Sequence, residues 1–192
     1  MFATTNKLLL DYLRVVIDGG TIPTANDRRD LAIELHEIII GLDFIIERVI
    51  KLEKKITVLS ELREATTPSF ESSKEKHARV ELKLLTQSFY YSAARARAVA
   101  RNTKFPLPGL KSFECAGVRD VRNKLLEHPG GSDSQVFVVS FMRGGNYGPV
   151  IKPLRRVGQE NVFPDAGLFI NAEEFKSNLE LLLTNELKRN GS

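Results

Sequence analysis

The sequence has little cysteine and no long uninterrupted apolar run. Its single cysteine, Cys115, cannot form an internal disulfide, which favours a reducing compartment. Charged residues break every apolar run well short of the roughly 18 residues that a membrane span needs. Asp11, Arg14 and Asp18 also stand where a signal peptide would be apolar. The sequence therefore predicts a cytoplasmic protein with no membrane association.

The chain also lacks a strong charge of one sign. Its 192 residues include 42% hydrophobic and 27% charged residues, with a formal net charge of +4, which is the balance of a globular protein. That mild positive excess permits binding to RNA without requiring it. No repeat, low-complexity tract or clear boundary divides the chain. We therefore expect residues 1–192 to form one domain with a single sizeable core.

Apolar spacing predicts a bundle of helices. Residues 6–18 are expected to form a first helix that stops at a pair of glycines. A much longer helix, of about 40 Å or more, is predicted from Asp27 onward, because apolar residues recur at alternating steps of four and three. The residues of this heptad stripe are Leu31, Leu35, Ile38, Leu42, Ile45, Val49, Leu52, Ile56 and Leu59.

Two further helices are predicted after an exposed connection at residues 66–76. The first begins near Ala78 and ends before the segment FPLPG, and it should form a hairpin with the long helix. The next should run from about Ser112 to His128, because Pro129 follows and disfavours a helical conformation at the preceding residue. Cys115, Ala116 and Gly117 would give this helix a thin face for close packing.

The amino-acid composition changes after these helices. Residues 134–156 combine β-branched and aromatic segments with the turn signal RGGNYG, so a β-hairpin is predicted there as an appendage. Asn171 can cap a last helix, with Glu174 at its third position. The expected fold is mainly α: an up-down helical bundle with a long helical hairpin and a small β-hairpin inserted before the last helix.

The strongest functional signal is the segment VRDVRNKLLEHP at residues 118–129. In it, Arg122 is followed at once by the polar Asn123 and, after five intervening residues, by His128 at the end of a late helix. This pattern resembles the R-x(4 to 6)-H motif of the HEPN superfamily, whose members are helical bundles of toxin–antitoxin modules, phage defence and RNA processing. The resemblance covers roughly residues 6–128 and the last helix, whereas residues 134–169 depart from a minimal HEPN bundle.

The resemblance implies metal-independent cleavage of RNA, in which a ribose 2′-hydroxyl attacks the adjacent phosphate and leaves a cyclic phosphate. Arg122 would hold the phosphate oxygens, and His128 would transfer a proton near neutral pH. Asn123 would orient either group, while Arg119 and Lys124 are the expected RNA-binding residues. The helix C-terminus favours a charged His128, so the group that acts as base stays open.

Geometry suggests that one copy of the motif makes an incomplete site. Six helical residues separate Arg122 from His128 by about 9 Å along the axis and about a third of a turn around it. In proteins that the chain resembles, two copies face each other across a dimer, so a homodimer is expected. The heptad stripe and the thin face at residues 115–117 are the two candidates for the contact.

Other interpretations remain open. Arg122 and His128 also fit a solvated helix end, with Arg122 paired to Glu127 or Asp120. The bundle could then be a non-catalytic binding module, a partner of a nucleotidyltransferase or other protein encoded nearby, or a helical assembly protein unrelated to HEPN. The cluster of Arg95, Arg97 and Arg101 fits either an RNA contact or a solvated face. No cofactor or metal site is predicted, because His36 and His77 lack partners at ligand spacing.

Overall fold

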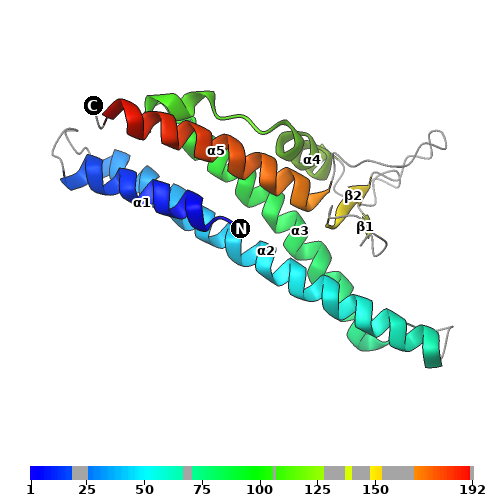
Figure 1. Cartoon of the computed structure of the whole chain (residues 1–192). Helices are drawn as coiled ribbons and strands as arrows, with labels where there is room; N and C mark the ends of the chain where they lie inside the picture. Colours follow the sequence, from blue (N-terminus) through cyan, green and yellow to red (C-terminus); the bar gives the residue numbers. More distant parts are fainter. Residues whose placement is uncertain are drawn as a thin grey trace.

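The computed structural model describes residues 1–18, 26–66, 71–105, 107–127, 137–139, 148–152 and 167–190. The described part of the chain is mainly helical, as predicted (Figure 1). Its elements are α1 (Ala3–Asp18), α2 (Asn26–Thr66), α3 (Ser73–Ala100), the 3-10 helix η1 (Pro108–Ser112), α4 (Ala116–Glu127), β1 (Phe137–Val139), β2 (Val150–Lys152) and α5 (Leu168–Asn190). Among the described helices, none has an apolar stretch long enough to cross a bilayer.

The two longest described helices, α2 and α3, form a hairpin. The 41 residues of α2 give it a length of about 60 Å, and α3 packs back along it as the sequence predicts. The apolar α2 residues that are fully buried against the core are Ala32, Leu35, Ile39, Leu42, Ile46, Val49, Leu52 and Ile56. Four residues of the predicted stripe are only partly buried: Leu31, Ile38, Ile45 and Leu59. At each of these four steps the next residue is buried instead, so the buried seam lies one residue later than predicted there.

A buried ionic cluster joins the end of α2 to the start of α3. Ser72 caps α3 by accepting a hydrogen bond from the backbone nitrogen of Glu75 at 3.2 Å. The fully buried Glu75 carboxylate accepts hydrogen bonds from Ser60 Oγ at 2.9 Å and from Arg79 Nη2 at 2.8 Å. Because Ser60 belongs to α2 and Arg79 to α3, the cluster helps to set the register of the hairpin.

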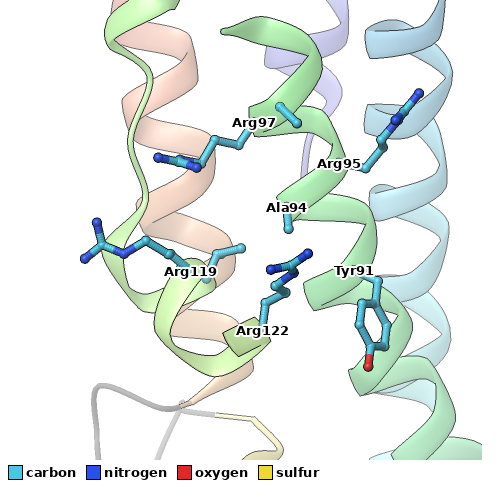
Figure 2. Close-up of a pocket in the computed structure, with 8 residues that line it drawn as sticks. Tyr91, Ala94, Arg95, Arg97, Arg119 and Arg122 are labelled. Atoms are coloured by element: carbon cyan, nitrogen blue, oxygen red, sulfur yellow. The ribbon is translucent and has the colours of Figure 1, made fainter. Parts of the chain in front are cut away.

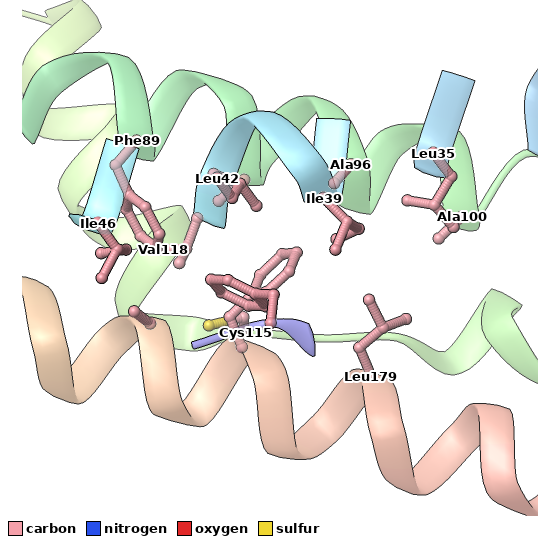
Figure 3. Packing of buried hydrophobic residues seen from close by; sticks show 14 of the residues in the cluster. Leu35, Ile39, Leu42, Ile46, Phe89, Ala96, Ala100, Cys115, Val118 and Leu179 are labelled. Carbon is pink, nitrogen blue, oxygen red and sulfur yellow. The ribbon is translucent and has the colours of Figure 1, made fainter. Parts of the chain in front are cut away.

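The core lies where α2 and α3 meet α1, α5 and the segment before α4. Phe113 packs edge-on against Phe175 of α5 at a centroid distance of 5.1 Å, and Phe175 packs in the same way against Phe2 at 6.0 Å. Figure 3 shows Ile39 and Leu42 of α2 on one side of this core and Leu179 of α5 on the other. In the bundle, α3 lies between α2 and α4, and α1 contacts both α2 and α5 (Figure 1).

The start of α4 corrects the prediction. The helix begins at Ala116, four residues after the predicted Ser112, because η1 occupies Pro108–Ser112 and Phe113 leaves it in an extended conformation. Cys115 is buried beside α5, with Sγ 3.9 Å from the Asn171 carbonyl oxygen. A Cβ added to Gly117 would overlap the Asn171 side chain. Cys115 and Gly117 therefore face α5 of the same chain, whereas Ala116 is exposed. The dimer contact expected at residues 115–117 stays a prediction.

The start of α5 also differs from the prediction. The helix begins at Leu168, so Asn171 lies within its first turn, where its backbone nitrogen donates to the Gly167 carbonyl at 3.1 Å. The side chain of Asn171 points into the core and donates from Nδ2 to Tyr90 Oη at 2.9 Å. This hydrogen bond satisfies two polar groups that burial would otherwise leave unpaired, and it ties α5 to α3.

Two short strands accompany the bundle. β1 pairs antiparallel with β2, with Phe137 opposite Lys152 and Val139 opposite Val150. Most of the predicted appendage at residues 134–156 lies outside the described residues. The β-hairpin and the single-domain organisation therefore stay predictions.

Candidate functional site

A pocket of about 510 Å³ lies between α3 and α4 (Figure 2). It is lined by Tyr91, Ala94, Arg95, Arg97, Ala98, Val118, Arg119 and Arg122. Half of these residues are arginines, which come in pairs from the two helices. The pocket therefore concentrates positive charge that the sequence distributes over two distant segments.

Helical spacing explains the wall that α3 contributes. Tyr91, Ala94, Arg95 and Ala98 follow one another at steps of three, one and three, which places them along one face of the helix. The methyl side chains of Ala94 and Ala98 leave space between the helices at this point. Into that space Arg122 of α4 extends its half-buried side chain, and Figure 2 shows it pointing toward α3 near Ala94 and Tyr91.

Carboxylates neutralise part of the charge. Arg95 donates to Glu34 of α2 from Nε at 2.7 Å, and Arg119 Nε lies 3.2 Å from Asp120. Arg97 donates two hydrogen bonds to the Glu114 carboxylate, and Arg101 forms an ion pair with the same carboxylate.

These ion pairs are accessible to solvent. Side-chain exposure is 65% for Arg95 and 50% for Arg119, and the Glu114 side chain is 46% exposed. Exposed pairs of this kind contribute only about 0–1 kcal/mol each, so a multiply charged anion can compete with the carboxylates for the guanidinium groups. The pocket is thus suited to oxyanions, which planar guanidinium groups bind with paired hydrogen bonds.

Tyr91 gives the pocket an aromatic edge. Tyr91 is 43% exposed, and its position on α3 places it beside the arginine-lined space (Figure 2). An exposed aromatic ring next to cationic groups can stack against a nucleobase while the cations hold the adjoining phosphate. Tyr91 was not singled out in the sequence, because nothing in its neighbourhood shows that α4 packs beside it.

The structure describes only some of the predicted site residues. Arg122 and Arg119 both line the pocket, together with two members of the predicted arginine cluster on α3. Asn123 and Lys124 belong to α4, but their side chains lie outside the described part of the structure. His128 follows the last residue of α4 and lies outside the described residues, so its proximity to Arg122 stays a prediction.

Cys115 and His77 do not line the pocket. Burial raises the pKa of the Cys115 thiol to about 12, so the thiol stays protonated and is a poor nucleophile. His77 forms a local contact of 2.6 Å between Nδ1 and the Ser73 carbonyl. In the described ranges, no three His, Cys, Asp or Glu residues gather as ligands of a metal ion would.

No family model, curated protein or solved structure matches this chain. The HEPN resemblance therefore stays a prediction that rests on the motif.

Proposed function

We propose that the chain is a HEPN-like, metal-independent endoribonuclease acting in defence, in a toxin–antitoxin module or in RNA processing. One observation carries the proposal: Arg122, the first residue of the motif, shares a pocket with three other arginines. A phosphodiester needs several hydrogen-bond donors around its oxygens, and arginines from two helices can supply them. The proposed catalytic residues are Arg122, Asn123 and His128, and the proposed RNA-binding residues include Arg119 and Lys124.

The proposed binding mode follows from the pocket walls. Phosphate oxygens of the RNA exchange places with the carboxylates that now pair with the exposed arginines, and the arginine fork holds two oxygens of one phosphate. Tyr91 supports a neighbouring unpaired base by stacking. The pocket favours a single-stranded RNA segment, because paired bases would not be available to the ring.

The proposed reaction needs one acid, one base and a cationic holder of the phosphate. The ribose 2′-oxygen forms a bond to phosphorus as its proton passes to the base, and the bond from phosphorus to the 5′-oxygen breaks. His128 follows the C-terminus of α4, whose dipole favours the imidazolium form, so it donates a proton to the leaving 5′-oxygen. Arg122 stabilises the charge that builds on the phosphate oxygens. The products are a 2′,3′-cyclic phosphate and a 5′-hydroxyl.

A non-catalytic binding module is the second candidate. Exposed apolar side chains on α2, such as Phe44 with 66% of its surface exposed, favour an interaction with a protein. In that case the pocket binds an anionic ligand or partner without cutting it.

Cleavage of a mixed RNA pool in the presence of a chelator separates the two candidates. The native protein, Arg122→Ala, His128→Ala and the control Arg14→Ala would be compared, and the RNA ends analysed for cyclic phosphate. Arg14 is a suitable control because it is an exposed arginine on α1. Cleavage lost in both site variants but kept in the control supports the ribonuclease. Equal or absent cleavage in all four proteins favours the binding module.

A further inference from the structure

The long helix α2 carries a second apolar stripe on its outer side. Five large apolar residues of α2 are exposed there, with exposed fractions between 37% and 66%: Ile33, Ile40, Phe44, Val58 and Leu62. At about 100° per residue they fall within an arc of about 40° on an ideal helix. The centre of that arc lies opposite Leu42 and Ser60, which are buried on the core side. We call these five residues the outer stripe.

A helix at the surface of a monomer normally has one apolar face, which it buries against the core. α2 has two, and the inner one is already covered by α3 within the same chain. The outer stripe extends from Ile33 to Leu62, a distance of about 45 Å along the helix. Its apolar residues form two exposed clusters, one from Ile33 to Phe44 and one from Val58 to Leu62, with exposed charged residues between them. Exposed apolar clusters on the outer side of a helix mark an interaction site.

The charges beside the outer stripe are separated along the helix. Glu37 and Glu47 lie in its N-terminal half, and Lys51, Lys54 and Lys55 lie in its C-terminal half; all five are exposed. Within the described residues none of the five forms an ion pair. Between Glu37 and Lys55 the outer face of α2 is thus acidic in its first part and basic in its second, which is the pattern of a self-complementary surface.

We propose that the outer face of α2 pairs antiparallel with the same face of a second copy. A two-fold axis near Glu47 and Arg48 places each residue opposite a residue of the second copy. The numbers of two facing residues then add up to about 95. Ile33 then faces Leu62 of the second copy. Glu37 comes within one helical turn of Lys54 and Lys55, and Glu47 within one turn of Lys51. In a closed two-fold contact every such pair occurs twice.

The alternative arrangements fit less well. A parallel, in-register pair would set the three lysines of one copy against those of the other, and like charges at such a contact repel. The exposed apolar residues of α3, Val80, Leu84 and Tyr91, are accompanied by Lys76, Lys83 and Arg95, so a self-contact there meets the same repulsion. That face suits an anion better than a second copy.

This inference does not rest on the ribonuclease proposal. Because α3 lies between α2 and α4, the outer face of α2 points away from the arginine pocket. The two pockets of the dimer then lie apart, unlike the facing pair of motifs that the HEPN resemblance implies. Self-association and RNA cleavage can therefore succeed or fail independently.

Charge reversal tests the proposal. The 192-residue chain should show twice its mass of 21.5 kDa by light scattering or sedimentation. The triple variant Lys51→Glu, Lys54→Glu, Lys55→Glu should be monomeric, and so should the double variant Glu37→Lys, Glu47→Lys. An equimolar mixture of these two variants should recover the dimer mass, because acidic and basic faces again meet.

Leu62→Asp, at an exposed leucine that faces Ile33 of the second copy, should also abolish the dimer, whereas Leu181→Asp, at a matched leucine of α5 with 60% exposure, should leave it intact. Circular dichroism would establish that each variant keeps its helices. A native protein that is monomeric at concentrations of tens of micromolar would overturn the proposal. So would a dimer that survives Leu62→Asp, or a mixture of the charge variants that stays monomeric.

Discussion

The guanidinium of Arg97 donates two hydrogen bonds to the carboxylate of Glu114, from Nε at 2.9 Å and from Nη2 at 2.7 Å. Arg97 belongs to α3, and Glu114 belongs to the extended segment that leads into α4. The Glu114 carbonyl also accepts a hydrogen bond from Asn178 of α5 at 3.0 Å. This pair therefore helps to place α4 against α3 at the pocket, and at the same time it neutralises one of the pocket arginines.

Glu114→Gln should have two effects of opposite sign. Loss of the carboxylate weakens the contact to α3, so the free energy of unfolding should fall by about 1 kcal/mol. The affinity for single-stranded RNA should rise several-fold, because Arg97 and Arg101 lose a competing anion. Urea unfolding and fluorescence anisotropy measure the two quantities. Glu61→Gln, at an exposed position on α2, should change neither. An RNA affinity that falls together with stability would contradict the proposed role of Arg97.

RNA binding should depend on salt through the pocket arginines. Each phosphate contact releases counterions, so Arg95→Ala and Arg119→Ala should each lower the slope of log affinity against log salt by roughly 0.7 on a single strand. Lys7→Ala, at an exposed lysine of α1, is the matched control and should leave the slope unchanged. Anisotropy titrations at several salt concentrations give the slopes. If the native protein and the three variants have equal slopes, RNA binds outside the arginine pocket.

Stability should fall in acid because of Glu75. Burial alone would raise the pKa of its carboxyl, but hydrogen bonds from Arg79 and Ser60 and the charge of Arg63 outweigh burial and hold the pKa below its ordinary value of 4.5. A carboxyl with a lowered folded-state pKa stabilises the fold above its unfolded-state pKa, and this contribution is lost as the pH falls through the folded-state pKa.

Glu75→Gln should accordingly be less stable than the native protein at pH 7 by about 1–3 kcal/mol. The difference should shrink as the pH falls below about 4.5. Urea unfolding between pH 7 and pH 3 measures both proteins, with Glu64→Gln as an exposed control on α2. A difference that stays constant across this range would show that the lost interaction is not ionic.

Two glycines should respond in opposite directions to alanine. Gly117→Ala brings a Cβ into the Asn171 side chain, which is held by Tyr90, so the unfolding free energy should fall by about 1–3 kcal/mol. Gly41→Ala on α2 meets nothing within 4 Å and removes flexibility from a helix interior, so it should add about 0.5–1 kcal/mol. Thermal and urea unfolding would compare them. A neutral Gly117→Ala would mean that α4 and α5 are packed less closely than the structure shows.

Local periodicity made the helices predictable. The alternating steps of four and three along α2 and α3 indicate a hairpin, because residues three or four apart share one face whatever the rest of the chain does. Local signals failed where a tertiary contact competed with them. Asn171 is a residue type that caps helices, but its side chain donates a hydrogen bond to Tyr90 instead, and α5 already begins at Leu168. Pro108 and η1 likewise delay the start of α4.

The sequence by itself determined that the chain is mainly helical, that α2 and α3 pair, and that Arg122 begins a motif worth testing. Only the tertiary structure decided what these elements face. Arg97 and Arg122 share a pocket although they lie far apart in the chain. Cys115 and Gly117 pack against α5 of the same chain. The physical reason is that spacing along a helix specifies which side chains share a face, whereas the partner of that face depends on how all the helices fill the core together.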